Sequence, residues 1–374
     1  MSQNQRRLKI ALVTDTVNTA AGAGAVVSGQ LLADRLRQHN DVIVISSDSQ
    51  NADVKLRGIR PTIFASVRHG QFVFAIPDRK KIREAFADVD IVHLHLPFWL
   101  SFVALDEARK AGKIVVASFH VQPENILSNV HIHSPWLSRK LYRFWIKNFW
   151  NRADLVMCPS PFAVQKLQSY DLRTPAVAIS NGVTTEPVSG NYEREPQHKG
   201  YFLIFMLGRL DSEKEQHILI NAVKRSKHRD KIKIVIAGMG KNEKKLRRLG
   251  ETLPNGAEVG FISDERKTRL LATADLFVHC SSVELEGMAV LEAMGAGLPA
   301  LVAEGPETAA ADLALPDFRF PVGNADVLMK KIDWLIDHPE DLERARKLYR
   351  DKAQKLSVVK SVKDIETEYQ ALCR

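Results

Sequence analysis

The feature that most constrains the fold is a pair of successive series in which short β-branched runs alternate with amphipathic stretches. This alternation is typical of parallel strands joined by crossover helices. The first series predicts strands at residues 8–14, 42–45, 91–95, 114–119, 155–158 and 176–179. The second predicts strands at residues 202–207, 232–237, 258–261, 276–279 and 299–302. The sequence therefore predicts an α/β protein with two Rossmann-like, doubly wound parallel sheets.

A polar, irregular stretch separates the two series and predicts the domain boundary. We expect an N-terminal domain at residues 1–185, a linker at 186–200, a C-terminal domain at 201–340 and helices at 341–374 that return to the N-terminal domain. A chain of 374 residues exceeds what one hydrophobic core usually fills. Doubly wound domains bind ligands at the carboxyl ends of their strands, so we expect two facing domains with a deep cleft between them.

The composition of the chain indicates where in the cell the protein is located and which kinds of molecule it binds. The chain is 45% hydrophobic, and no apolar stretch approaches the roughly 20 residues of a membrane-spanning helix. Three widely spaced cysteines predict a reducing, cytoplasmic setting without a zinc site. The net charge of +9 predicts an anionic partner, either a phosphorylated substrate or the surface of an acidic membrane. No nucleic-acid-binding signature is present, so we expect no nucleic-acid partner.

Two glutamates mark the most informative segment, SSVELEGMAVLEAMGAGLP at residues 281–299. Glu284 lies in the loop after a predicted strand, and Glu292 lies about two turns into the helix that follows. Each carboxylate can accept hydrogen bonds from the vicinal hydroxyls of a sugar or a ribose, and the helix N-terminus suits a phosphate. Alone, the two glutamates are equally compatible with ordinary acids at a helix start.

Two cations bracket a turn in the segment LGRLDSEK at residues 207–214. Gly208 lets the backbone turn, and Arg209 and Lys214 are placed so that both can reach one diphosphate, neutralising a leaving group. The alternative is that the charges of this segment are solvated helix caps. Gly238 belongs to a second glycine turn, AGMG at residues 237–240.

A histidine follows a predicted strand of the first series. His120 comes directly after the apolar run 114–119, where a neutral imidazole can donate to a sugar hydroxyl or to developing phosphate charge. The alternative is a histidine satisfied by a loop carbonyl. His93 and His95 alternate on another strand, and we assign them structural or acceptor-side roles and no metal.

The order and spacing of these motifs resemble those of the retaining glycosyltransferases with the GT-B fold that carry paired glutamates seven residues apart. In chain order the motifs are TDT at 14–16, DIVHLHLP at 90–97, FH at 119–120, SNGV at 180–183, GRLDSEK at 208–214, AGMG at 237–240 and ADLFVHCSSVELEGMAVLEAMGAGLP at 274–299. The family often has proline and phenylalanine after the first glutamate, whereas this chain has Leu285 and Glu286.

The resemblance implies a metal-independent hexosyltransferase without a cofactor, which uses a nucleotide sugar as donor. It implies that Arg209 and Lys214 clamp the diphosphate, Glu284 contacts the transferred sugar, Glu292 holds the ribose and His120 lies against the reacting sugar. The glycines and the helix start that it places around the donor are Gly22, Gly24, Gly208, Gly238, Gly287 and Met288.

A basic and aromatic segment suggests where the acceptor binds. No acidic residue lies between Glu124 and Asp154, whereas Arg139, Arg143 and Lys147 recur every fourth residue and form one stripe of a helix. Aromatic side chains, Trp145 among them, interleave with this stripe. This composition is typical of a helix that lies in the interface of an anionic bilayer. The alternative is a helix buried against its own domain with a solvated basic face.

The preceding segment FHVQPEN, at residues 119–125, is similar to that of bacterial glycosyltransferases that build glycosyl-diacylglycerols. That resemblance implies an acceptor hydroxyl near His120, Gln122 and Glu124 and a peripheral location on the inner face of the cell membrane. We therefore expect a UDP-hexose donor, carrying glucose or galactose, and a diacylglycerol or monoglycosyl-diacylglycerol acceptor. Two alternatives stay open: the same donor chemistry on a soluble or polymer-linked saccharide, and a non-catalytic nucleotide-sugar or nucleic-acid binding protein.

Overall fold

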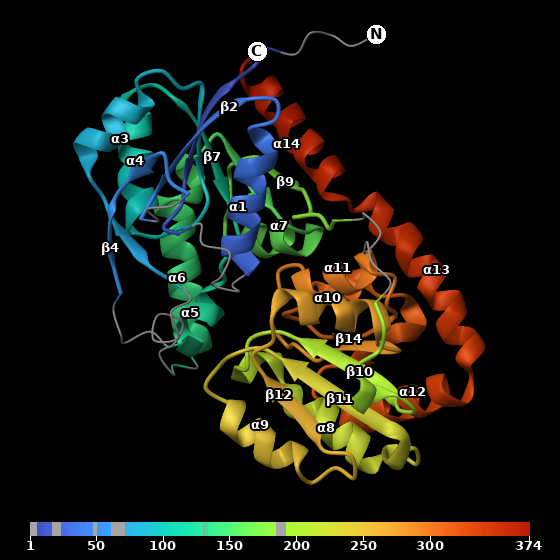
Figure 1. Cartoon of the computed structure of the whole chain (residues 1–374). Helices are drawn as coiled ribbons and strands as arrows, with labels where there is room; N and C mark the ends of the chain where they lie inside the picture. The colour runs from blue at the N-terminus through green and yellow to red at the C-terminus, as the bar shows by residue number, and fades with distance from the viewer. Residues whose placement is uncertain are drawn as a thin grey trace. The chain divides into compact units, whose positions relative to one another are not determined.

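A computed structural model describes residues 6–16, 24–47, 51–60, 72–129, 132, 134–184 and 192–374. The chain divides into two compact units. Unit 1 comprises residues 1–181 and 359–374, and unit 2 comprises residues 182–358. The last helix, α14 (Val358–Leu372), therefore packs almost entirely with the N-terminal part of the chain (Figure 1).

Unit 1 is built on a parallel sheet. Within the described residues the sheet has seven strands, and every pair in it is parallel. In spatial order the strands are β3 (Val54–Lys55), β2 (Asp41–Ser46), β1 (Lys9–Val13), β6 (Ile91–Leu94), β7 (Ile114–Ser118), β8 (Leu155–Cys158) and β9 (Ala176–Ala178). The order reverses between β1 and β6, and such a switch point opens a crevice for ligands at the carboxyl ends of the strands.

Helices and one hairpin complete unit 1. The helices are α1 (Gly24–Leu36), α3 (Arg79–Phe86), α4 (Trp99–Lys110), α5 (Pro123–Asn129), α6 (Pro135–Asn148), α7 (Pro161–Gln168) and the C-terminal α14. Strands β4 (Arg57–Ile59) and β5 (Phe74–Ile76) form a separate antiparallel pair. The C-terminal helix is bound through the core, since Val362 and Tyr369 are buried with Leu8, Ile10 and Val116 of the sheet.

Unit 2 repeats the architecture with six strands in the described residues. In spatial order they are β12 (Ala257–Gly260), β11 (Ile232–Ala237), β10 (Phe202–Leu207), β13 (Leu276–His279), β14 (Ala300–Glu304) and β15 (Arg319–Pro321). The α-helices are α8 (Gln216–Arg225), α9 (Glu243–Gly250), α10 (Asp264–Thr273), α11 (Met288–Gly295), α12 (Ala325–Asp337) and α13 (Pro339–Lys355). Here the order reverses between β10 and β13. The predicted α/β class with two doubly wound parallel sheets is confirmed.

The burial of these strands agrees with their apolar sequences. β13 and β8 are buried along their whole length, and β10 and β11 have buried interiors. Strands covered on both faces appear in the sequence as continuous apolar runs rather than as alternating ones. The carboxyl ends of such strands are the rigid points from which the loops of the candidate site begin.

Candidate functional site

The loops after β10 and β13 meet at the switch point of unit 2. The carbonyl of Glu213 accepts hydrogen bonds from the Ser282 amide at 2.9 Å and from the Ser281 hydroxyl at 3.1 Å. Glu215 takes a left-handed conformation with φ of 47°, which turns the chain from the short 3-10 segment at Ser212–Lys214 into α8. Hydrogen bonds between the two loops therefore hold residues 208–215 against residues 280–287.

Across this junction Lys214 and Glu284 form an ion pair, with the Lys214 Nζ on the Glu284 Oε1. The backbone of Glu284 is held from the other side, because its amide donates to the Glu307 carbonyl at 3.1 Å and its carbonyl accepts from the Ala309 amide at 2.9 Å. Both side chains are largely buried. The structure thus brings together one predicted cation and one predicted carboxylate, fixed by the backbone on both sides.

The electrostatics of the pair favour a charged carboxylate. Burial by itself would raise the pKa of Glu284, but the Lys214 ammonium and His279 outweigh it and hold the pKa well below its ordinary value. The His279 Nε2 lies 3.2 Å from the Glu284 Oε1. His279 is the last residue of β13 and was not among the predicted site residues. It could have been found from the sequence, because it ends the strand that leads into the loop of Glu284.

Arg209 lies in the same loop but is held by its own neighbours. Its guanidinium donates to the Asp211 Oδ2 at 2.7 Å and to the Glu213 Oε1 at 2.5 Å. Its carbonyl accepts from the Gln216 side chain at 2.6 Å. Arg209 and Lys214 therefore lie in the same loop, but the charge of Arg209 is already balanced by Asp211 and Glu213.

Two glycines allow the strand ends to approach closely. A Cβ added to Gly238 would lie 1.9 Å from the Gly208 carbonyl oxygen, and Gly238 has φ of 153°. A Cβ at Gly240 would fall within 2.7 Å of three backbone atoms of Leu210. Both predicted glycine turns are therefore needed for the backbones of the β10 and β11 loops to pack.

The remaining predicted donor residues surround α11. Gly287 precedes this helix with φ of 102° and offers no side chain to cap it, so the first turn at Met288 is not capped by a side chain. Glu292, on the second turn, pairs with Lys267 of α10 at 3.1 Å. Burial would lower the pKa of Lys267, but Glu292 and Asp264 raise it. The structure thus pairs Glu292 with α10, whereas Glu284 pairs with Lys214.

In unit 1 the predicted His120 lies beyond the end of β7 and against another histidine. The ring centroids of His95 and His120 are 4.4 Å apart. Burial, followed by the neighbouring His95 and His93, lowers the pKa of His120 well below its ordinary value, so its imidazole is neutral. His93 is fully buried and bonds the Ser118 hydroxyl at 2.6 Å and the Tyr369 hydroxyl. It therefore has a structural role. Of the predicted glycines here, Gly24 begins α1, whereas Gly22 lies outside the described residues.

A buried carboxylate at the end of β1 was not predicted. Asp15 Oδ1 accepts from the Ala75 amide at 3.0 Å, and Oδ2 has no hydrogen-bond partner among the described residues. Burial raises the pKa of Asp15 to about 7, against the smaller effect of the Ala75 amide. The predicted Gln122 is also buried, and within the described part of the chain its Oε1 has no partner. The sequence signal for Asp15 was a lone acid directly after an apolar strand.

The basic, aromatic segment forms α6, which has one buried and one exposed face. Ser138, Tyr142, Trp145 and Ile146 are buried, and the Tyr142 hydroxyl donates to the predicted Glu124 at 3.1 Å. Trp145 is only 5% exposed and packs edge-on against Trp150, so its placement at a membrane-facing surface is corrected: it is a core residue.

The exposed face of α6 carries the predicted cations. Arg139, Lys140, Arg143 and Lys147 are all exposed. Two aromatic side chains of the same helix also reach solvent, Trp136 at 63% and Phe144 at 54% exposure. We call these six residues the α6 face. No helix among the described residues combines the length and apolar character that crossing a bilayer requires.

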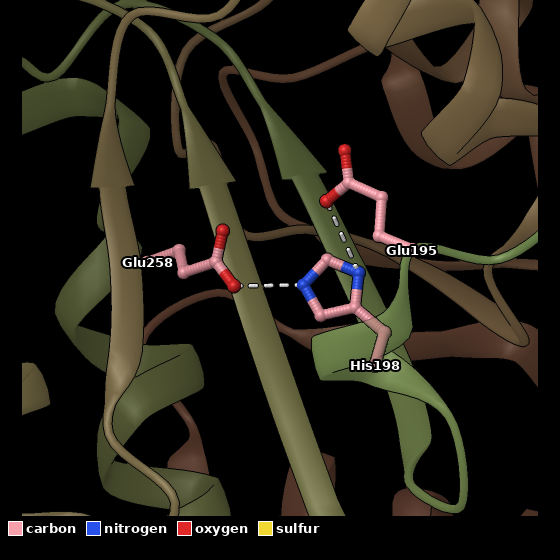
Figure 2. Close-up of side chains that lie close together, drawn as sticks. All are labelled: Glu195, His198 and Glu258. Atoms are coloured by element: carbon pink, nitrogen blue, oxygen red, sulfur yellow. Dashed lines mark hydrogen bonds and ion pairs between the residues drawn. The ribbon is translucent and has the colours of Figure 1, made fainter.

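A second cluster of titratable side chains, in unit 2, was missed. Figure 2 shows the buried His198 ring between two carboxylates, with Nε2 at 2.7 Å from Glu258 and Nδ1 at 3.5 Å from Glu195. The three residues offer metal-ligand atoms within 4.8 Å of one another. Arg266, however, already donates to both carboxylates at 2.6 Å. The cluster is therefore a closed ion-pair network that ties the segment before β10 to β12 and α10, and no motif in the sequence marked it.

Known proteins with sequences similar to this chain include one from a bacterium and one from a plant. The chain is 24% identical over 257 residues to the alpha-monoglucosyldiacylglycerol synthase of Streptococcus pneumoniae, which covers 62% of this chain and 58% of that protein. It is 25% identical over 295 residues to the sulfoquinovosyl transferase SQD2 of Arabidopsis thaliana, over 71% of this chain and 53% of that protein. The chain thus spans little more than half the length of these curated relatives.

The fold itself is matched along nearly the whole chain. The crystal structure of HepE from Anabaena in complex with UDP-glucose superimposes with a TM-score of 0.75 at 18% identity, covering 98% of this chain and 100% of that one. Residues 22–187 match the family model Glycosyltransferase Family 4, and residues 188–352 match Glycosyl transferases group 1. With both units accounted for in this way, the chain belongs to the group 1 glycosyltransferases of the GT-B fold.

Proposed function

We propose that this chain is a retaining hexosyltransferase that moves glucose or galactose from a UDP-sugar to a membrane lipid such as diacylglycerol or monoglycosyl-diacylglycerol. The observation that carries the donor half is the Lys214–Glu284 ion pair at the switch point between β10 and β13. A fixed carboxylate beside a fixed ammonium suits a ligand that combines sugar hydroxyls with a diphosphate. HepE, which shares the fold, binds UDP-glucose.

Unit 2 provides the donor contacts in this proposal. Lys214 has three N–H groups, so it can keep its bond to Glu284 while it donates to a phosphate oxygen. Arg209 supplies the second cation, and the N-terminal amides of α11 after Gly287 face the other phosphate oxygens. Glu284 accepts from the hydroxyls of the transferred hexose, and Glu292 accepts from the ribose.

The reaction needs no covalent enzyme intermediate. The acceptor hydroxyl attacks the anomeric carbon on the face that the diphosphate leaves. The new C–O bond forms as the old one breaks, and the hydroxyl proton passes to the departing phosphate oxygen, so the configuration is retained. Lys214 and Arg209 stabilise the charge that develops on the leaving diphosphate. Neutral His120 donates a hydrogen bond to the reacting sugar.

The lipid acceptor is supported by the α6 face and by the name of one relative. Four exposed cations together with the exposed Trp136 and Phe144 match the chemistry of an anionic bilayer interface. The pneumococcal relative is a monoglucosyldiacylglycerol synthase. We propose that the enzyme binds peripherally to the inner face of the cell membrane, with Gln122 and Glu124 near the acceptor head group.

The test is a transfer assay with radiolabelled UDP-glucose and UDP-galactose. Each donor is incubated with vesicles containing diacylglycerol or monoglucosyl-diacylglycerol, and in parallel with water-soluble hexose phosphates. We expect label in the organic phase and an α-linked product by NMR. Label found only in water-soluble products would overturn the lipid acceptor and leave the donor chemistry in place. Absence of transfer from either donor to any acceptor would contradict the UDP-hexose assignment.

A further inference from the structure

The ring of His95 fills a narrow space between α1 and His120. His95 follows β6, its amide donates to the Val13 carbonyl at 3.0 Å, and its side chain is fully buried. On one side it contacts the His120 ring, with centroids 4.4 Å apart and planes tilted by 43°. It therefore joins the ends of β6 and β7 through side chains, beyond the last residues of both strands.

His95 also packs against a helix position where only glycine fits without movement. A Cβ added to Gly29 of α1 would lie 3.0 Å from the His95 Nε2 and 3.2 Å from the His95 Cδ2. Gly29 stands in the helix interior, where alanine would favour the helix by about 1 kcal/mol. A methyl group there would displace the His95 ring by a few tenths of an ångström and so disturb its contact with the His120 ring.

His120 depends on such a support. β7 ends at Ser118, so no strand pairing fixes the residue that carries the imidazole. His120 as a residue is partly exposed, and the His95 contact limits the rotation of its ring. A donor to a reacting sugar must be held within fractions of an ångström to be effective.

We propose that His95 is a positioning residue for His120, wedged between Gly29 and the His120 ring so that the imidazole presents a fixed N–H to the sugar. The inference rests on the proposed function, because it takes His120 to touch the transferred sugar. His95 acts through the shape of its ring.

Four variants test the wedge: Gly29→Ala, His95→Ala, the double variant, and His95→Phe, which keeps a planar ring. We expect Gly29→Ala and His95→Ala each to lower kcat about tenfold, with the KM for the UDP-sugar changed by less than about twofold. In the His95→Ala background the alanine at position 29 no longer meets an imidazole ring. The double variant should therefore have the same kcat as His95→Ala. His95→Phe should restore most of kcat.

Two controls separate this inference from the proposed function. Gln30→Ala, on the exposed side of the same helix, should leave kcat unchanged, and the thermal melting of all variants shows whether they fold. If His120→Ala lowers kcat but the effects of Gly29→Ala and His95→Ala simply multiply, the wedge is wrong and the proposed function stands. If His120→Ala leaves kcat unchanged, both the wedge and the catalytic role of His120 are wrong. Loss of activity in His95→Phe equal to that in His95→Ala also overturns the wedge.

Discussion

Lys214 and Glu284, seventy positions apart in the chain, form an ion pair because the loops that carry them follow adjacent parallel strands. Burial would raise the pKa of Glu284, yet the Lys214 charge and His279 keep it ionised. The ionised state of Glu284 therefore depends on Lys214 and His279. A bound diphosphate would add a third partner to this pair, which makes Lys214 the most informative position to change.

Lys214→Ala should lower kcat/KM for transfer from the UDP-sugar by about 10²-fold or more, because one fixed cation at the leaving group is removed. The variant also leaves the Glu284 carboxylate largely buried without its cation, which should destabilise the protein by about 3 kcal/mol. Lys227→Ala removes a lysine whose ion pair with Asp337 is exposed, and it serves as the matched control with unchanged kinetics. Wild-type activity in a folded Lys214→Ala protein would refute the donor site proposed for unit 2.

Adding Glu284→Gln to Lys214→Ala separates the loss of stability from the loss of transfer activity. The neutral amide no longer needs a cation, so the double variant should regain most of the stability while transfer stays low. Chemical denaturation of the wild type, both single variants and the double variant gives the coupling energy. A double variant as unstable as the sum of the two single variants would contradict the coupling between Lys214 and Glu284.

The sequence predicted the buried strands better than the exposed ones. The bounds predicted for β8, β10, β11 and β13 coincide with those observed, because these strands are continuous apolar runs. Four short strands were missed, namely β3, β4, β5 and β15. β4 is exposed along its three residues, and β15 has three residues and ends in a proline. Their pairing depends on neighbours that are distant in the sequence.

Amphipathic elements with many charges were also hard to recognise. No element was predicted at residues 79–86, yet they form α3, whose Ile82 and Phe86 are buried and whose N-cap is Asp78. The ends of the C-terminal helices, in contrast, lie beside residues that are easy to recognise: α12 ends at Asp337, just before Pro339, and α13 ends at Lys355, just before Ser357. Proline and cap residues give local signals, and these do not require knowledge of the partner element.

For the candidate site, residue types could be predicted from the sequence but their partners could not. Motif spacing named Lys214 and Glu284, yet the pairing of Glu292 with Lys267 follows from how α10 and α11 pack. Trp145 shows the same limit, because a helical wheel gives the faces of α6 and leaves open which face is buried. The orphan oxygen of Asp15 depends on the absence of tertiary partners among the described residues, which no local pattern shows.

Gly238→Ala should destabilise unit 2 strongly. The new Cβ would overlap the Gly208 carbonyl at 1.9 Å in a backbone conformation with positive φ, and no flexible side chain can yield. We expect a loss of about 3 kcal/mol or more in the free energy of unfolding. Gly256→Ala is the control, because Gly256 also has positive φ but its Cβ would meet nothing within 4 Å, so it should lose only about 1 kcal/mol. Denaturation followed by circular dichroism compares the two, and equal losses would contradict the close approach of the β10 and β11 loops.

Asp15→Asn should change how the stability of unit 1 depends on pH. The pKa of Asp15 is raised from 3.8 to about 7 in the folded state, so the folded state binds the proton more tightly than the unfolded state. Wild-type stability from this group is greatest below pH 4 and falls as the pH rises to 7, by up to about 4 kcal/mol. The asparagine variant loses this dependence, so it should be more stable than wild type at pH 8 and similar at pH 4. Four of the five tryptophans lie in unit 1, so urea denaturation followed by tryptophan fluorescence reports on it. A stability difference that does not vary with pH would show that Asp15 titrates normally.

Reversing the charge of the α6 face should abolish binding to anionic membranes. Each exposed lysine or arginine near an anionic surface contributes about 1 kcal/mol, so a triple change of Arg139, Arg143 and Lys147 to glutamate should weaken vesicle binding at least about 100-fold. The matched control reverses Lys244, Lys245 and Arg248, three exposed cations of α9, with the same change in net charge. Trp136→Ala with Phe144→Ala removes the exposed aromatic groups without altering charge, and it should weaken binding less steeply and with little dependence on salt. Sedimentation with phosphatidylglycerol vesicles at low and high salt measures all three variants. Equal loss of binding in the α9 control would show that net charge alone drives the association, and undiminished binding of the α6 triple variant would exclude this helix as the membrane contact.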